Sequence, residues 1–60
     1  MFKLGDLVKI AADTETAYEI INVKKRGLIY DLKRDSDVLV LKNVPYSMII
    51  SSEKKSNELN

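Results

Sequence analysis

The sequence predicts a single small all-β domain. Its apolar residues occur in short runs that alternate with polar side chains, which is typical of half-buried strands. These runs are rich in Val, Ile and Tyr, whose side chains suit a pleated surface. Polar segments containing Gly, Asp, Asn or Pro separate the runs and mark turns. At 60 residues, the chain has room for one domain.

The first two predicted strands are separated by a polar loop. Residues 7–10 alternate around Lys9, and the preceding Gly5-Asp6 is a turn signal. Residues 11–16 are polar and show no apolar period, so we expect a loop with at most one helical turn there. Residues 17–23 are rich in β-branched and aromatic side chains, which predicts the second strand.

This second strand carries apolar side chains on both of its faces. Tyr18 and Ile20 share one face, whereas Ile21 and Val23 share the other. Either both faces are partly covered, or a bulge shifts the alternation between the two pairs.

A β-hairpin is expected next. Residues 24–27 read Lys-Lys-Arg-Gly and predict a compact turn, in which Gly27 is free to take a positive φ. Residues 28–33 alternate again and form the third predicted strand. Two strands joined by a short turn that contains Gly are typical of a hairpin. The polar segment 34–37 predicts the turn that follows.

Two further strands complete the predicted domain. Residues 38–44 form the fourth strand, which Pro45 ends because proline cannot donate a hydrogen bond to the sheet. A single 3₁₀ turn follows, and residues 48–50 form the last strand. We expect the domain to occupy residues 1–51 and the polar segment 52–60 to be a disordered tail.

One face of these strands is expected to form the core. Its members are Val8, Ile10, Tyr18, Ile20, Leu28, Tyr30, Leu32, Val40, Val44 and Ile49. The apolar residues on the opposite face of the strands are Ile21, Val23, Ile29, Leu39 and Leu41. A domain this small has one interior, so the second set is exposed, lies beside a bulge or meets another surface. We expect a dimer contact or a partner-binding face centred on Ile21, Val23 and Ile29, which lie on the two strands of the hairpin.

The composition offers little for catalysis. The chain has no His and no Cys, so the usual general base, thiol nucleophile and soft metal ligands are missing. Two pairs of carboxylates share loops, Asp13 with Glu15 and Asp35 with Asp37. Each pair either serves turn geometry or loosely holds a hard cation. We expect a protein that is not an enzyme and has no catalytic residue, metal site or small-molecule cofactor.

Charge and hydropathy indicate which partners and which compartment to expect. The net charge is +1, whereas dedicated nucleic-acid clamps are usually strongly basic. The first residues do not follow the pattern of a signal peptide. No apolar run approaches the ~20 residues that span a bilayer. We therefore expect a cytoplasmic protein that does not bind membranes.

The predicted order of strands and turns resembles the Src-homology-3-like (SH3-like) small barrel. The opening Gly5-Asp6-Leu7-Val8-Lys9-Ile10 resembles the first strand of KOW and related barrels, although the glycine-rich second half of a KOW motif is absent. The segment Val44-Pro45-Tyr46-Ser47-Met48-Ile49 resembles the short turn before their last strand. The chain is also similar to small SH3-like proteins of phages and prophages of Gram-positive bacteria. This resemblance implies a five-stranded SH3-like barrel, with a one-turn 3₁₀ helix before the last strand, that serves as a binding module.

The candidates for its binding site are the basic turn of Lys24, Lys25 and Arg26 and the aromatic residue Tyr46. Cations at a hairpin turn either contact phosphate groups or only keep the turn soluble. The Tyr46 ring either is exposed in a ligand groove or packs in the core. We expect a module that binds a protein partner or a second copy of itself, such as a phage-type accessory or inhibitor protein. The alternative is a barrel that binds nucleic acid through the basic turn.

Overall fold

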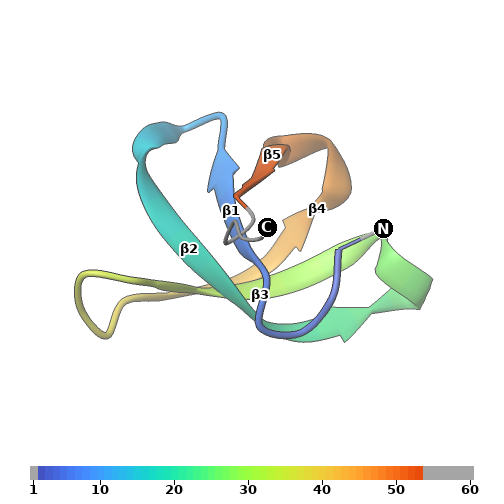
Figure 1. Ribbon diagram of the computed structural model, residues 1–60. Helices are drawn as coiled ribbons and strands as arrows, with labels where there is room; N and C mark the ends of the chain where they lie inside the picture. The colour runs from blue at the N-terminus through green and yellow to red at the C-terminus, as the bar shows by residue number, and fades with distance from the viewer. Residues whose placement is uncertain (1, 54–60) are drawn as a thin grey trace, which may run out of the picture.

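Five antiparallel strands form one curled sheet in the computed structural model of the chain, which describes residues 2–53 (Figure 1). In chain order, the strands are β1 (Leu7–Ile10), β2 (Asp13–Lys24), β3 (Ile29–Arg34), β4 (Val40–Pro45) and β5 (Ile49–Glu53). Two 3₁₀ turns connect them, η1 (Lys25–Gly27) before β3 and η2 (Tyr46–Met48) before β5. The prediction of a small all-β fold with five strands and a 3₁₀ turn before the last strand is confirmed.

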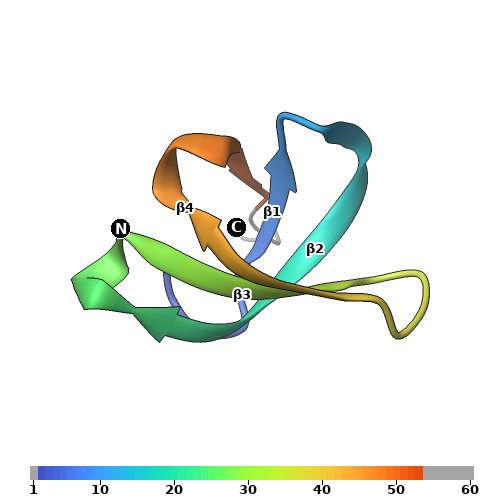
Figure 2. The same ribbon diagram turned by 180° about the vertical axis from the view of Figure 1, so that it is seen from behind.

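The sheet has the strand order β4-β3-β2-β1-β5 and is open. The long strand β2 pairs along its first part with β1 and along its second part with β3. The hairpin of β3 and β4 ends in a loop that projects from the rest of the molecule, as Figures 1 and 2 show from opposite sides. Because the edge strands β4 and β5 are not hydrogen-bonded neighbours, the described residues form a curled sheet that does not close into a barrel.

The loop predicted over residues 11–16 is shorter than expected. Only Ala11 and Ala12 form the turn, since β2 already begins at Asp13, which pairs with Ile10. The hydroxyl of Tyr18 donates a hydrogen bond to Asp13 Oδ2 at 3.0 Å and helps to hold this end of the strand. A strand with polar side chains on both faces gives no alternating apolar pattern, so the sequence did not reveal it.

A bulge in β2 explains why apolar residues change face within this strand. Ile20 pairs with Leu32 and Val23 pairs with Tyr30, and the register shifts in between. Both Ile20 and Val23 therefore reach the core, while Ile21 remains exposed at the bulge. Of the two alternatives that the sequence left open, the structure has the bulge.

A second bulge, in β4, overturns the predicted burial of Val40. Tyr30 pairs with Val44 and Leu32 pairs with Leu41, so β4 has one extra residue between the two pairs. Asn43 has a φ of 58°, which bends the strand at this point. Leu41 therefore packs against the core, whereas Val40 is exposed. The prediction was wrong because the alternation of apolar and polar residues does not reveal the extra residue in β4.

Leu28 was also predicted to be buried and is instead 63% exposed. Lys25, Arg26 and Gly27 all have positive φ, and Leu28 that follows them has a helical backbone conformation. The strand starts only at Ile29, so Leu28 does not take part in its alternation. The left-handed turn thus moves this apolar side chain from the interior to the surface.

The core contains residues from all five strands. Eight hydrophobic residues are buried, namely Val8, Ile10, Tyr18, Ile20, Tyr30, Leu32, Val44 and Ile49. All eight belong to the ten that the sequence predicted. Phe2, Val23 and Leu41 pack against this cluster from its margins.

The buried hydroxyl of Tyr30 provides a test of the core. Among the described residues it has no hydrogen-bond partner, although Tyr30 is fully buried. A buried polar group without a partner is destabilising, so Tyr30→Phe is expected to raise the free energy of unfolding by ~1 kcal/mol. Urea unfolding followed by circular dichroism measures this change. A clear loss of stability in Tyr30→Phe would show that the hydroxyl makes a hydrogen bond in solution.

The last strand extends beyond the predicted end of the domain. Strand β5 reaches Glu53, which pairs with Leu7 of β1, whereas the tail was expected to begin at residue 52. The rest of the predicted tail, residues 54–60, lies outside the described residues.

Candidate functional site

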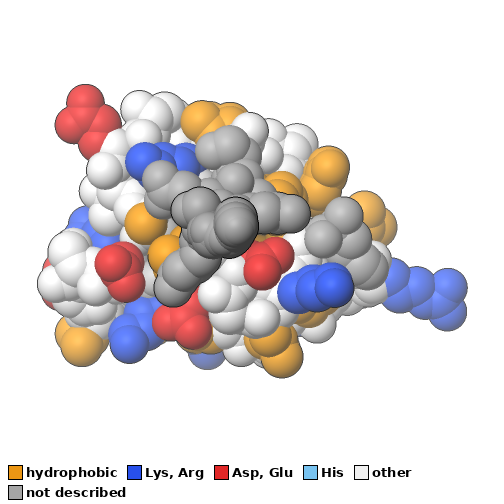
Figure 3. Space-filling model, in the orientation of Figure 1, with side chains coloured by type: hydrophobic (Ala, Val, Ile, Leu, Met, Phe, Trp, Pro, Cys, Tyr) orange, Lys and Arg blue, Asp and Glu red, His pale blue; other side chains and the backbone are white. Residues whose placement is uncertain are grey.

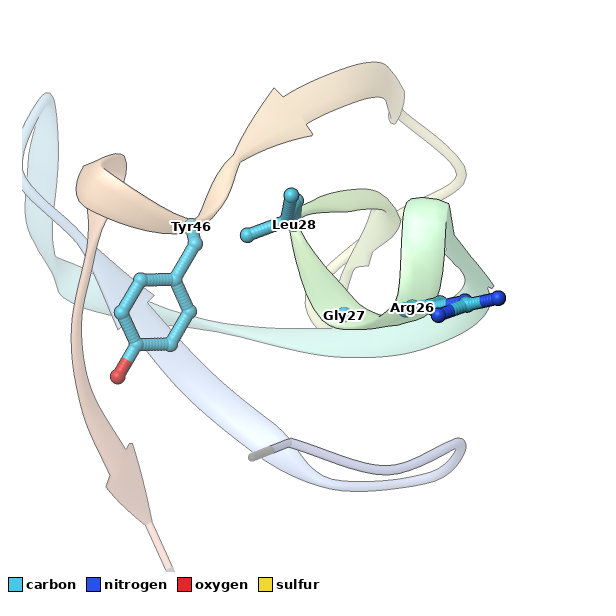
Figure 4. Close-up of a pocket in the computed structure, with 4 residues that line it drawn as sticks. All are labelled: Arg26, Gly27, Leu28 and Tyr46. Atoms are coloured by element: carbon cyan, nitrogen blue, oxygen red, sulfur yellow. The ribbon is translucent and has the colours of Figure 1, made fainter.

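A hollow lies between the two 3₁₀ turns in the described part of the chain. It has a volume of about 260 Å³ and is lined by Arg26, Gly27, Leu28 and Tyr46 (Figure 4). The backbone N–H of Tyr46 donates to the carbonyl oxygen of Leu28 at 2.8 Å, which fixes η2 beside η1. We call this site the η1–η2 groove.

Two exposed apolar side chains form the walls of the η1–η2 groove. Leu28 extends towards the side of Tyr46, and Arg26 lies on the far side of the turn (Figure 4). Leu28 is 63% exposed and Tyr46 is 49% exposed. Single exposed apolar residues are ordinary, but two that flank a hollow are typical of a contact site. Of the two alternatives for Tyr46, the structure has the ring in a groove and not in the core.

The ring of Tyr46 is supported by a small aromatic cluster. Its centroid lies 5.6 Å from that of Phe2, which in turn lies 5.8 Å from Tyr30 in an edge-to-face arrangement. Such ring pairs add stabilisation beyond simple burial. Because Tyr30 belongs to the core, Phe2 connects the wall of the groove to the interior, a role that no sequence pattern predicted.

The basic side of the groove has an unusual backbone. Lys25 and Arg26 have φ values of 52° and 56°, and Gly27 has 94°. Only Gly27 was predicted to adopt this conformation. In a non-glycine residue it costs ~1–2 kcal/mol. Residues held in such conformations are concentrated at binding and active sites, so this turn is a candidate for function.

The third residue of the predicted basic turn, Lys24, has a structural role. Its Nζ lies 3.2 Å from Asp31 Oδ1 and donates to Asn43 Oδ1 at 2.9 Å. This ion pair attaches the end of β2 to β3 and β4. The Lys24 side chain is therefore engaged within the sheet, whereas those of Lys25 and Arg26 are exposed in η1.

Asp31 is the buried partner of Lys24 and was not among the residues predicted from the sequence. The backbone N–H of Asn43 donates to its Oδ1 at 2.9 Å, and Asn22 Nδ2 donates to its Oδ2 at 3.3 Å. The hydrogen bond from Asn43 is the main cause that lowers the pKa of Asp31, with Lys24 and Asn22 adding to it against the effect of burial. An acid within an apolar strand was the only signal in the sequence.

The apolar face expected from Ile21, Val23 and Ile29 is interrupted. Val23 packs against the core because of the bulge, whereas Ile21 is 41% exposed at the bulge itself. Ile29 is half-buried and pairs with Lys24 and Pro45. The three residues therefore do not form one continuous exposed patch.

One carboxylate of each predicted pair, Asp13 and Asp37, serves local turn geometry. Asp13 accepts hydrogen bonds from Tyr18 and from the backbone N–H of Glu15, and the first of these is the main cause that lowers its pKa. Asp37 accepts two hydrogen bonds from the Arg34 guanidinium, at 3.0 and 2.7 Å, which lower its pKa to about 2. Within residues 2–53, no group of three or more acidic, His or Cys side chains could hold a metal ion.

These carboxylates predict a loss of stability in acid. A carboxyl whose pKa is lower in the folded state stabilises the fold above its unfolded value, and this contribution disappears as the pH falls through the folded value. The melting temperature is therefore expected to fall from about pH 5 towards pH 2. In Asp37→Asn this fall should be slightly shallower, because an exposed ion pair contributes little. Thermal melts across this pH range measure both effects, and a melting temperature independent of pH would contradict the ion-pair assignment.

Charged and apolar side chains are spread unevenly over the surface. On the face drawn in Figure 3, hydrophobic side chains lie in separate spots between charged ones. Basic side chains project from the right-hand end, where Figure 1 places η1. The acidic side chains visible on this face lie closer to its centre and left. The η1 end is therefore the more basic end of the visible surface.

Comparison of the chain with protein-family models, curated proteins and solved structures finds no match. The geometry of the groove is therefore the basis for assigning its chemistry. Across residues 2–53, no helix has the length and apolar character needed to cross a membrane.

Proposed function

We propose that this chain is a small, non-enzymatic SH3-like binding module that holds a protein partner in the η1–η2 groove. The observation that carries the proposal is the pair of exposed apolar side chains, Leu28 and Tyr46, on either side of a hollow. Exposed apolar surface beside a concave site favours contact with another molecule.

The strand arrangement supports the SH3-like part of the proposal. The sheet order has the first and last strands side by side, and a 3₁₀ turn joins β4 to β5. Val44 of β4 and Ile49 of β5 belong to the same core cluster, although their strands share no hydrogen bonds. In this proposal, side-chain packing brings the two edges of the sheet together as in a small barrel.

The residues of the groove favour binding over catalysis. Its lining offers one phenol and one guanidinium, and the whole chain lacks His and Cys. A general base or nucleophile needs a partner within hydrogen-bond reach, and the lining side chains include no carboxylate that could act as one. The groove thus has the means to hold a ligand but not those to transform it.

A capture experiment tests the proposal. The full chain, immobilised through its C-terminus, is used as bait in a lysate of the native host, with and without nuclease. We expect a captured protein that survives nuclease treatment and is lost with Leu28→Asp and with Tyr46→Ala. Val38→Asp is the matched control, because Val38 is 83% exposed on the distant β3–β4 loop.

Two results would contradict the proposal. One is capture that ends when nuclease is added, which would favour the alternative of a nucleic-acid-binding module. The other is capture that Val38→Asp abolishes while Leu28→Asp does not, which would place the contact on the β3–β4 loop.

A further inference from the structure

We propose that the segment bound in the η1–η2 groove is acidic, with an apolar side chain between Leu28 and Tyr46 and carboxylates beside Lys25 and Arg26. This inference rests on the proposed function and specifies the partner's chemistry. It follows from the charge, the backbone and the size of the groove.

The exposed positive charge at η1 supports this inference. Lys25 and Arg26 are exposed, and neither has an ion-pair partner among the described residues. Lys24, the preceding residue, differs because it is paired with Asp31. Exposed cations at the edge of an apolar groove are complementary to a ligand that carries negative charge next to an apolar group.

The backbone conformation of η1 also supports this inference. A left-handed backbone is almost free for Gly and costly for Lys or Arg. The turn nonetheless holds Lys25 and Arg26 in this conformation, although they make no ion pair within the described chain. The strain is therefore not offset by an internal salt bridge, which is consistent with a role for the two cations towards a partner.

The groove is also small. Its volume of about 260 Å³ lies below the ~300–1,000 Å³ that is typical of small-molecule sites. A space of this size suits a side chain of a bound segment better than a cofactor. Leu28 and Tyr46 form its walls, so an apolar side chain fits them.

The same observations favour an acidic peptide over a nucleic acid. Binding to nucleic acid commonly uses many cations along the backbone and aromatic faces on which bases stack. Here the groove lining contains one cation, Arg26, with Lys25 next to it in η1, and the ring of Tyr46 is packed against Phe2. The opposite wall is Leu28, which offers no aromatic face.

Nuclear magnetic resonance titration of the ¹⁵N-labelled full chain tests the inference with four probes. The first is a short peptide with a central Leu between Asp and Glu residues. The second replaces those acids by Lys, the third replaces the Leu by Ala, and the fourth is an oligothymidine. We expect the first peptide to shift the amide signals of Arg26, Gly27, Leu28 and Tyr46, with an affinity that falls as salt is added.

Two double variants, each of which removes two positive charges, show whether binding depends on the charges at η1 or on the net charge of the protein. Lys25→Gln with Arg26→Gln is expected to weaken binding of the acidic peptide roughly tenfold, since it removes the complementary charges. Lys33→Gln with Lys42→Gln removes as much charge from exposed positions on β3 and β4 and should leave the affinity nearly unchanged. The dispersion of the amide spectrum confirms that each variant is folded.

The outcomes distinguish this inference from the proposed function. If the Lys peptide shifts the groove signals as strongly as the acidic one, the acidic preference is wrong while the groove remains a docking site. If oligothymidine shifts them more strongly than any peptide, both proposals are wrong. If no peptide shifts them although capture of a protein depends on Leu28, the acidic inference alone is overturned.

Discussion

Truncation of Ile20 to Ala is expected to lower the free energy of unfolding by ~2–5 kcal/mol, the range for large-to-small changes in a packed core. Ile20 is 1% exposed and pairs with Leu32 in the middle of the sheet. Its backbone also donates to the Asp6 carbonyl oxygen at 2.9 Å and accepts from the Gly5 N–H at 2.8 Å. Since the core of a domain this small rarely supplies more than ~3–5 kcal/mol of stability, a large part of the population would unfold.

The neighbouring residue supplies the control for this prediction. Ile21→Ala removes the same atoms from a side chain that is 41% exposed at the bulge. It is expected to cost less than ~1 kcal/mol, because little packing is lost. Urea unfolding of both variants, followed by circular dichroism, gives the comparison. Equal losses at the two positions would show that the bulge between Ile20 and Asn22 is misplaced.

Replacement of Asp31 by Ala is expected to cause the second-largest loss, a drop of several degrees in the melting temperature. The carboxylate accepts hydrogen bonds from three partners, one of which is the backbone N–H of Asn43 in the β4 bulge. Without it, this N–H loses its acceptor and Lys24 loses its counter-ion. Both bulges are affected, because Asn22 lies at one and Asn43 at the other.

Asp31→Asn separates the hydrogen bond from the charge. An amide oxygen can still accept from Asn43 but cannot pair with the ammonium group of Lys24. The melting temperature of this variant should lie between those of wild type and Asp31→Ala. Because the pKa of Asp31 is lowered in the fold, wild type should also lose more stability than Asp31→Asn as the pH falls through the acid range. An unchanged melting temperature in Asp31→Ala would mean that the network does not stabilise the sheet.

Alternation of apolar residues was enough to predict most of the core. It located β1 at its observed bounds and all eight of the buried hydrophobic residues. The two errors, Leu28 and Val40, lie next to a left-handed turn and at the end of a bulged strand. At such points, backbone hydrogen bonds decide which face of the strand a side chain occupies, and the order of apolar and polar residues does not reveal them.

The candidate site was predicted only in part, for a related reason. Tyr46 and Arg26 were chosen by residue type and do line the groove. Leu28 was assigned to the interior, although its exposure is what makes the groove apolar. Phe2 and Asp31 act through contacts with residues far away in the sequence, and no local pattern identifies such contacts.

The bend at Asn43 also has a consequence for solubility at high protein concentration. An edge strand such as β4 can recruit a strand of another molecule through its unpaired backbone groups, which leads to aggregation. In β4, however, the N–H of Asn43 is already bound to Asp31, and Pro45 has no N–H to offer. The positive φ of Asn43 further breaks the flat run of backbone that an incoming strand would need. One buried carboxylate thus both maintains the register inside the fold and helps to block the edge against uncontrolled growth of the sheet.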